Sequence, residues 1–88
     1  MNIFTFADII NAQFVIRRYS NQHNRWIAHF EDCEVKEGPI LSSTYGEGNT
    51  ANEAIFSYVD KIRNQTIVMY AYSEKRKEFR VPDNLMMG

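Results

Sequence analysis

Residues 50–64 constrain the fold more than any other part of the sequence. Apolar residues recur there at intervals of three and four, the spacing that gathers side chains on one face of an α-helix. These residues are Ala51, Ala54, Ile55, Tyr58, Val59 and Ile62. Thr50 and Glu53 have the spacing of a capping box, which satisfies free backbone N–H groups in the first turn, and Asn64 suits a helix end. We therefore predict a helix over residues 51–64 that packs its apolar stripe onto a sheet.

Runs of β-forming residues flank this helix on both sides. They predict strands over residues 14–19, 25–35, 40–45, 66–72 and 78–81, with a polar turn at residues 20–24. A short helix, capped by Thr5, precedes them. Because consecutive strands have short connections, we expect them to pair antiparallel. The predicted fold is α+β, with an antiparallel sheet of about five strands in the order α-β-β-β-α-β-β, the helices on one face and a flexible tail at residues 83–88.

The length and composition of the chain indicate the class of protein. Its 88 residues are enough for one hydrophobic core, and 44% of them are hydrophobic, so we expect a single domain over residues 1–88. A net charge of −1 gives no bulk attraction to nucleic acid or to an anionic membrane. Cys33 is the only cysteine, and no segment has the pattern of a signal peptide or a membrane span. We expect a cytoplasmic protein with no membrane partner.

The motif Gly46-Glu47-Gly48, just before the helix, is the nearest approach to a phosphate-binding loop. Such loops point backbone N–H groups at an anion from the start of a helix. The motif lacks the third glycine of a dinucleotide fingerprint and the lysine of a P-loop, and Glu47 would repel a phosphate. We interpret it as a tight turn from strand to helix and expect no cofactor.

His23, His29 and Cys33 are the residues best suited to metal binding or nucleophilic catalysis. Their spacing matches no common zinc motif, and a zinc site needs three or four converging ligands. Asp32 and Glu34 flank Cys33, and their negative charges oppose formation of the reactive thiolate. We therefore predict no metal site and no catalytic residue. An enzyme would need a concave site that gathers His29 with acidic side chains.

Aromatic and basic residues gather toward the C-terminal end of the sequence. The strand predicted over residues 66–72 presents Tyr70 and Tyr72 on one face, where Tyr19 is a further neighbour, and a charged turn follows. Tyrosine and arginine dominate the binding energy of protein interfaces, whereas rings beside cations also bind single-stranded nucleic acid. The helix adds one large apolar residue outside its stripe. The candidate contact residues are Tyr70, Tyr72, Lys75, Arg76, Arg80 and Phe56.

Two stretches of the chain resemble a known family. Residues 26–32 read Trp-Ile-Ala-His-Phe-Glu-Asp after a hairpin turn, and residues 48–54 read Gly-Asn-Thr-Ala-Asn-Glu-Ala at the start of the helix. Together they resemble HicB-type antitoxins, which have a partial ribonuclease-H-like fold and block a partner toxin. The proline usual in that family stands as Glu31 here, and the segment over residues 34–45 is longer. The resemblance implies that the protein acts by binding another protein.

The closing part of the chain is similar to small uncharacterised phage and prophage proteins. That likeness rests on Ile67-Val68, Ala71, Arg76 and Val81-Pro82, which follow a G-x-G-x-T-x-x-E-A-I helix. It implies a non-enzymatic, phage-type binding module in the cytoplasm of a bacterial host, either an inhibitor of a host defence protein or an antitoxin-like blocker. A host or phage protein is the favoured partner because the chain is not basic. The alternative is a single-stranded nucleic-acid-binding domain with an aromatic and basic sheet face, and a homodimer also stays open.

Overall fold

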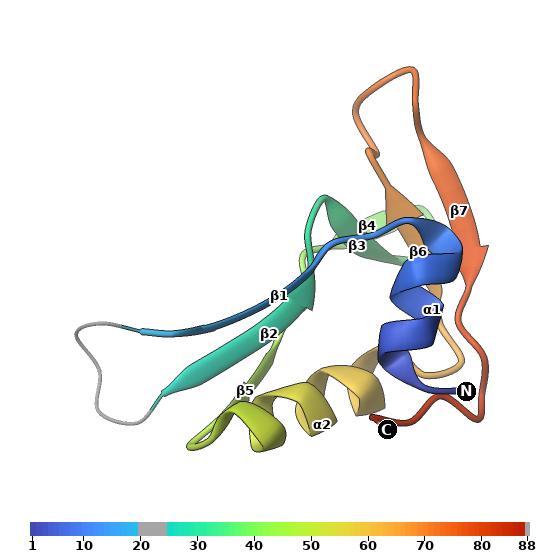
Figure 1. Ribbon diagram of the computed structural model, residues 1–88. Coiled ribbons are helices and arrows are strands. Elements are labelled where there is room, and N and C mark those ends of the chain that lie inside the picture. The colour runs from blue at the N-terminus through green and yellow to red at the C-terminus, as the bar shows by residue number, and fades with distance from the viewer. Residues whose placement is uncertain (20–24, 88) are drawn as a thin grey trace.

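The protein is built on two antiparallel sheets, one of three strands and one of four (Figure 1). The computed structural model describes residues 1–19 and 25–87, so the predicted turn at residues 20–24, with His23, lies outside the described residues. The helices are α1 (Ile3–Ile10) and α2 (Ala51–Ile62), and the strands are β1 (Phe14–Arg18), β2 (Trp26–Phe30), β3 (Cys33–Glu37), β4 (Ile40–Ser42), β5 (Gly46–Gly48), β6 (Thr66–Met69) and β7 (Lys77–Arg80). The sheets have the orders β1-β2-β5 and β4-β3-β6-β7, which confirms the α+β class. Neither of these helices has the length and apolar character to span a membrane.

Helix α2 carries the apolar stripe that the sequence predicts, and Figure 1 shows it along one side of the β1-β2-β5 sheet. The buried residues of the helix are Ala54, Ile55, Tyr58, Val59 and Ile62. At its start, the Thr50 hydroxyl oxygen accepts a hydrogen bond from the backbone N–H of Glu53 at 3.1 Å, which confirms the predicted N-cap. The helix ends at Ile62, and Asn64 follows with a left-handed φ of 63°.

Gly46 and Gly48 let α2 approach β5 closely. A Cβ atom at Gly46 would overlap the carbonyl oxygen of Ala54 and the amide nitrogen of Tyr58, both in the backbone of α2. A Cβ atom at Gly48 would overlap the side chain of Glu53. Glycine is therefore required where the helix packs on the strand. The strand-to-helix motif Gly46-Glu47-Gly48 has a packing explanation that involves no phosphate.

The division into two sheets differs from the single sheet that we predicted. One strand was expected over residues 25–35, but the chain bends at Asp32, where φ is 58°, and β2 and β3 enter different sheets. The strand expected over residues 40–45 divides in the same way, because β4 pairs with β3 and β5 pairs with β2. Strand propensity describes each residue separately and does not record where a chain changes partner. The two divisions turn five predicted strands into seven.

The closing hairpin of β6 and β7 is shorter than predicted. The strand expected over residues 66–72 ends at Met69, because Tyr70 adopts a left-handed backbone with a φ of 53°. β7 covers residues 77–80 rather than 78–81, and the N–H of Val81 instead donates to the carbonyl of Gln65 at 2.8 Å. The left-handed turn after β6 redirects the chain toward the junction between the two sheets.

The two ends of the described chain lie together. Asn2, rather than the predicted Thr5, caps α1, and its side-chain oxygen accepts a hydrogen bond from the first turn at 2.7 Å. Asn2 also forms a parallel bridge with Met86. Leu85 is only 1% exposed. We expected a flexible tail at residues 83–88, but residues 83–87 contribute a side chain to the core.

One hydrophobic core unites both helices and both sheets. Phe14 of β1 has its ring centroid 5.6 Å from that of Phe4 in α1 and 6.0 Å from that of Tyr58 in α2. Phe14 pairs with Phe30 of β2, whose ring also contacts Tyr58, at 5.4 Å. Both helices therefore pack on the same face of the β1-β2-β5 sheet, as predicted. Neither helix covers the opposite face of that sheet, which carries Arg17, Ile27 and His29.

Candidate functional site

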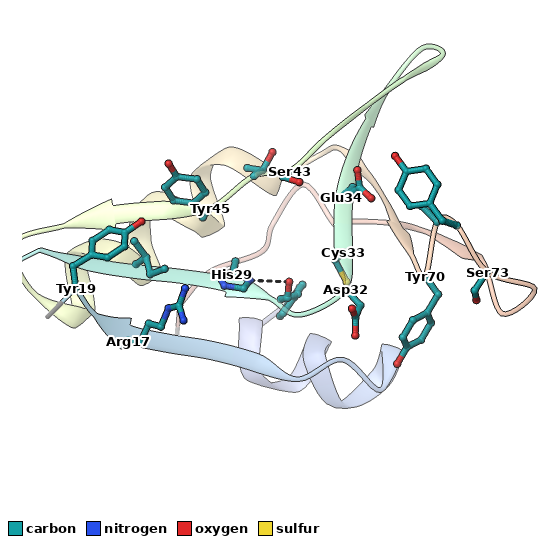
Figure 2. Close-up of a pocket in the computed structure, with 15 residues that line it drawn as sticks. Arg17, Tyr19, His29, Asp32, Cys33, Glu34, Ser43, Tyr45, Tyr70 and Ser73 are labelled. Atoms are coloured by element: carbon teal, nitrogen blue, oxygen red, sulfur yellow. Dashed lines mark hydrogen bonds between the residues drawn. The ribbon is translucent and has the colours of Figure 1, made fainter.

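A cleft of about 600 Å³ lies where the two sheets meet (Figure 2). Pockets that bind small molecules and cofactors typically measure roughly 300–1,000 Å³. Three parts of the chain line the cleft: the face of β1 and β2 away from α2, the bend between β2 and β3, and the turns before β5 and after β6. The division of the fold into two sheets therefore creates the cleft.

The alternation of side chains along β1 and β2 supplies one wall. Ile16 and its partner Ala28 face α2, so the neighbouring pair of Arg17 and Ile27 faces the cleft, as does His29. Ile27 is only 4% exposed, whereas Arg17 is exposed. An apolar floor thus lies beneath a cationic side chain.

Asp32 and Tyr70 are neighbours in the lining of the cleft, and both have left-handed backbones. Their φ angles are 58° and 53°, and the N–H of Tyr70 donates to the carbonyl of Asp32 at 3.0 Å. This conformation costs about 1–2 kcal/mol for a residue other than glycine, and it is uncommon for a bulky one. Residues held in such conformations cluster at functional sites. Aspartate adopts this conformation more readily than most residues, so the strained backbone of Tyr70 is the feature that supports a functional role for the cleft.

Tyrosine is the most frequent residue in the lining, with Tyr19, Tyr45, Tyr70 and Tyr72. Figure 2 shows Tyr19 and Tyr45 near one end of the cleft and Tyr70 at the other. Tyr70 is 39% exposed and Tyr72 is 87% exposed. Sequence patterns group Tyr19 with Tyr70 and Tyr72 but do not include Tyr45. Its place directly before Gly46 brings it to the cleft, because β5 pairs with β2.

Three charged side chains of the cleft remain available to a ligand. Asp32 lies at the bend between the sheets, Glu34 lies on β3, and Arg17 lies on β1. None of the three belongs to an ion pair within residues 1–19 and 25–87. A ligand in the cleft would therefore meet charged groups that these parts of the chain do not neutralise.

The structure brings only two of the predicted contact residues into the cleft. Tyr70 and Tyr72 line it. Phe56 is 58% exposed and lies on α2, behind the sheet that carries the cleft. These two surfaces are separate, so one partner segment in the cleft cannot also contact Phe56.

The basic candidates lie along the turn before β7 and on β7 itself. Lys75 is exposed in the turn. Arg76 forms an ion pair with Glu78 at 3.1 Å, and a nitrogen of Arg80 donates to the side-chain oxygen of Asn64 at 2.7 Å. The two arginines are thus engaged within the protein, and neither lines the cleft.

The cleft gathers His29 with Asp32 and Glu34, which is the arrangement that an enzyme would require. The Nδ1 atom of His29 lies 3.1 Å from the backbone oxygen of Phe30, the contact dashed in Figure 2. The imidazole is thus engaged by the main chain rather than by a carboxylate. Across the part of the chain that the structure describes, no three His, Cys, Asp or Glu side chains are grouped to hold a metal ion.

The thiol of Cys33 is poorly suited to nucleophilic catalysis. Burial, with a smaller contribution from the neighbouring charge of Asp32, raises its pKa to about 12. The thiolate is the nucleophilic form of cysteine, and its fraction at neutral pH falls as the pKa rises. Sequence reasoning identified the effect of Asp32 but not the larger effect of burial.

The raised pKa predicts an unusual pH dependence for alkylation of Cys33. Because the thiolate fraction rises about tenfold per pH unit below the pKa, the iodoacetamide rate should climb steadily from pH 8 to pH 10. A thiol with the ordinary pKa of about 8.5 would level off in that interval. Mass spectrometry of timed samples measures the rate, and the same chain in urea is the control. A plateau near pH 9 in the folded protein would contradict the prediction.

Comparisons with known proteins do not indicate a function for the cleft. No family model, curated protein or solved structure matches the chain. A function must therefore be argued from the side chains that line the cleft and from the surfaces around it.

Proposed function

We propose that the protein is a non-enzymatic binding module that docks on a partner protein through the cleft between its two sheets. The observation that carries this proposal is the lining itself, in which four tyrosines surround a space of about 600 Å³. Tyrosine contributes large contact area at low loss of conformational entropy, and it is enriched among the residues that dominate protein interfaces. A segment of a partner with apolar and polar side chains fits this lining.

The chemistry of the cleft favours binding over catalysis. The Cys33 thiol, with a pKa of about 12, stays protonated at neutral pH. His29 contacts the main chain at Phe30, and among the described residues it bonds no carboxylate of the cleft. The described residues of the cleft therefore hold no base that a carboxylate orients, which leaves the aromatic lining as its main chemical feature.

The biological role that we propose follows from the family resemblance. HicB-type antitoxins block a partner toxin, and small phage proteins of this build often act by binding a host protein. An inhibitor of a host defence protein, or an antitoxin-like blocker, would use the cleft in the same manner, in the cytoplasm of a bacterial host. The HicB-like stretch over residues 48–54 would then contribute to the fold, because its glycine and its N-cap residue position α2.

Single-stranded nucleic acid is the second candidate ligand. Exposed Tyr72 precedes a turn that carries Lys75, and rings beside cations are typical of such sites. Against this, Asp32 and Glu34 lie in the same cleft and would repel phosphate groups. The arginines near the turn also have partners within the protein. The balance of charge favours a protein partner.

A two-part binding experiment separates these candidates. The immobilised chain is exposed to a soluble bacterial lysate, and its affinity for a fluorescent single-stranded DNA of about 20 nucleotides is measured at several salt concentrations. The proposal predicts retention of a protein at a fixed ratio to the chain and weak DNA binding. Tight DNA binding with a steep salt dependence, and no retained protein, would contradict it.

A further inference from the structure

Strand β1 is an open edge of the three-stranded sheet. Within the described residues it pairs only with β2, and it is five residues long, compared with three for β4, three for β5 and four for β7. Charged side chains, a common protection against edge-to-edge pairing, occupy three of the four positions of β7, whereas in β1 they are confined to the last two, Arg17 and Arg18. The first three residues of β1 are Phe14, Val15 and Ile16, all apolar and all half-buried.

The hydrogen bonds of the hairpin show which backbone groups of β1 face outward. The N–H of Glu31 donates to the carbonyl of Gln13, and the N–H of Tyr19 donates to that of Arg25. In an antiparallel ladder such bonded pairs alternate, so the odd-numbered residues of β1 direct their N–H and C=O groups toward β2. Phe14 and Ile16 therefore direct theirs away from it. No backbone hydrogen bond within the described residues uses those groups.

The sequence of this edge is complementary to itself. If a second copy pairs antiparallel with a two-fold axis at Val15, Phe14 of each copy lies opposite Ile16 of the other and their outward N–H and C=O groups bond. Val15 then faces Val15 of the second copy, and Arg17 faces Gln13 rather than another arginine. Every cross-strand pair in this register joins two apolar residues or avoids like charges.

We infer that β1 is a dimerisation edge, at which two copies of the chain join their three-stranded sheets into one six-stranded sheet. The two-fold axis runs perpendicular to the sheet, so both helices α2 lie on one face and both clefts open on the other. Arg17 and His29 of each cleft lie on that second face. The dimer would therefore present two partner-binding clefts in the same direction, which raises the avidity for a partner with two sites.

The oligomeric state tests this inference first. Sedimentation equilibrium of the full chain, from about 10 μM to about 1 mM, should give a mass that rises from 10.3 kDa toward twice that value. A mass that stays at one chain throughout the series would overturn the inference.

The identity of the interface is tested by opposite charges at Val15. Val15→Lys and Val15→Glu each place like charges on the two-fold axis, so each variant alone should dimerise at least about tenfold more weakly than the unmodified chain. An equimolar mixture of the two should recover dimerisation, because lysine then faces glutamate. Circular dichroism confirms that each variant is folded. A mixture that dimerises no better than either variant alone would overturn the proposed register.

A backbone test does not depend on the charged variants. Ile16→Pro removes an outward N–H but none that bonds β2, whereas Ile16→Ala removes the same side-chain contacts and keeps the N–H. The inference predicts a weaker dimer for the proline variant than for the alanine variant. Equal dissociation constants for the two would contradict it.

Discussion

Replacing Gly46 by alanine should lower the free energy of unfolding by about 3 kcal/mol, one of the largest effects expected from adding a single methyl group. The new Cβ would overlap backbone atoms of Ala54 and Tyr58, and the Tyr58 Cα would lie 2.8 Å away. These atoms belong to a hydrogen-bonded helix, so α2 must move as a unit. The apolar stripe of α2 would then separate from β5 and β2, the strands of the β1-β2-β5 sheet that it contacts most.

Urea unfolding monitored by circular dichroism measures this effect, and Gly38→Ala is the matched control. Gly38 has a φ of 61°, and no described atom lies within 4 Å of the position that an added methyl group would take. Alanine there adds backbone strain but no overlap. We expect a loss of about 1 kcal/mol for Gly38→Ala. Similar losses for the two variants would contradict the assignment of Gly46 to helix packing.

Replacing Tyr70 and Tyr72 together by alanine should weaken binding of the partner protein about 100-fold. Both rings line the cleft, and Tyr72 is 87% exposed in the free protein, so it has most of its surface available to a partner. Truncation removes two aromatic contacts without opening a cavity in the core. Titration calorimetry with the protein retained from lysate measures the change.

Phe56→Ala is the control for the tyrosine variant. Phe56 is an exposed aromatic residue of similar size, but it lies on α2, behind the sheet that bears the cleft. We expect its removal to change the affinity less than twofold, roughly the effect of a contact outside an interface. A large loss from Phe56→Ala with none from the tyrosine pair would place the site on α2 instead.

The parts of the fold that follow from local patterns could be predicted from the sequence. The stripe of α2 and its Thr50 cap depend on residues within one helix, and both are confirmed. The division into two sheets could not be predicted, because the chain changes sheet at Asp32 and again between β4 and β5, where the sequence indicates continuous strands. A backbone hydrogen bond between distant parts of the chain joins the left-handed residues Asp32 and Tyr70, and a tyrosine gives no sequence signal for such a conformation.

Only part of the candidate site could be predicted from the sequence. Tyr70 and Tyr72 stand out in the sequence as aromatic residues beside a charged turn, and they line the cleft. Tyr45 and His29 join them only because β5 and β2 pair across a long separation in sequence. The Gly46-Glu47-Gly48 motif looked like a ligand loop, yet its glycines are explained by the approach of α2. A cleft between sheets is a property of their arrangement, and no single segment encodes it.

Hydrogen–deuterium exchange of the chain, with and without its captured partner, tests most directly whether the cleft is the functional site. The connection at residues 43–45 and the turn at residues 70–73 line the cleft, and amides outside helices and strands exchange rapidly when they are open to solvent. Binding in the cleft predicts slower exchange in both segments and unchanged exchange around Phe56 on α2. Protection confined to α2, with both segments unaffected, would contradict the central proposal.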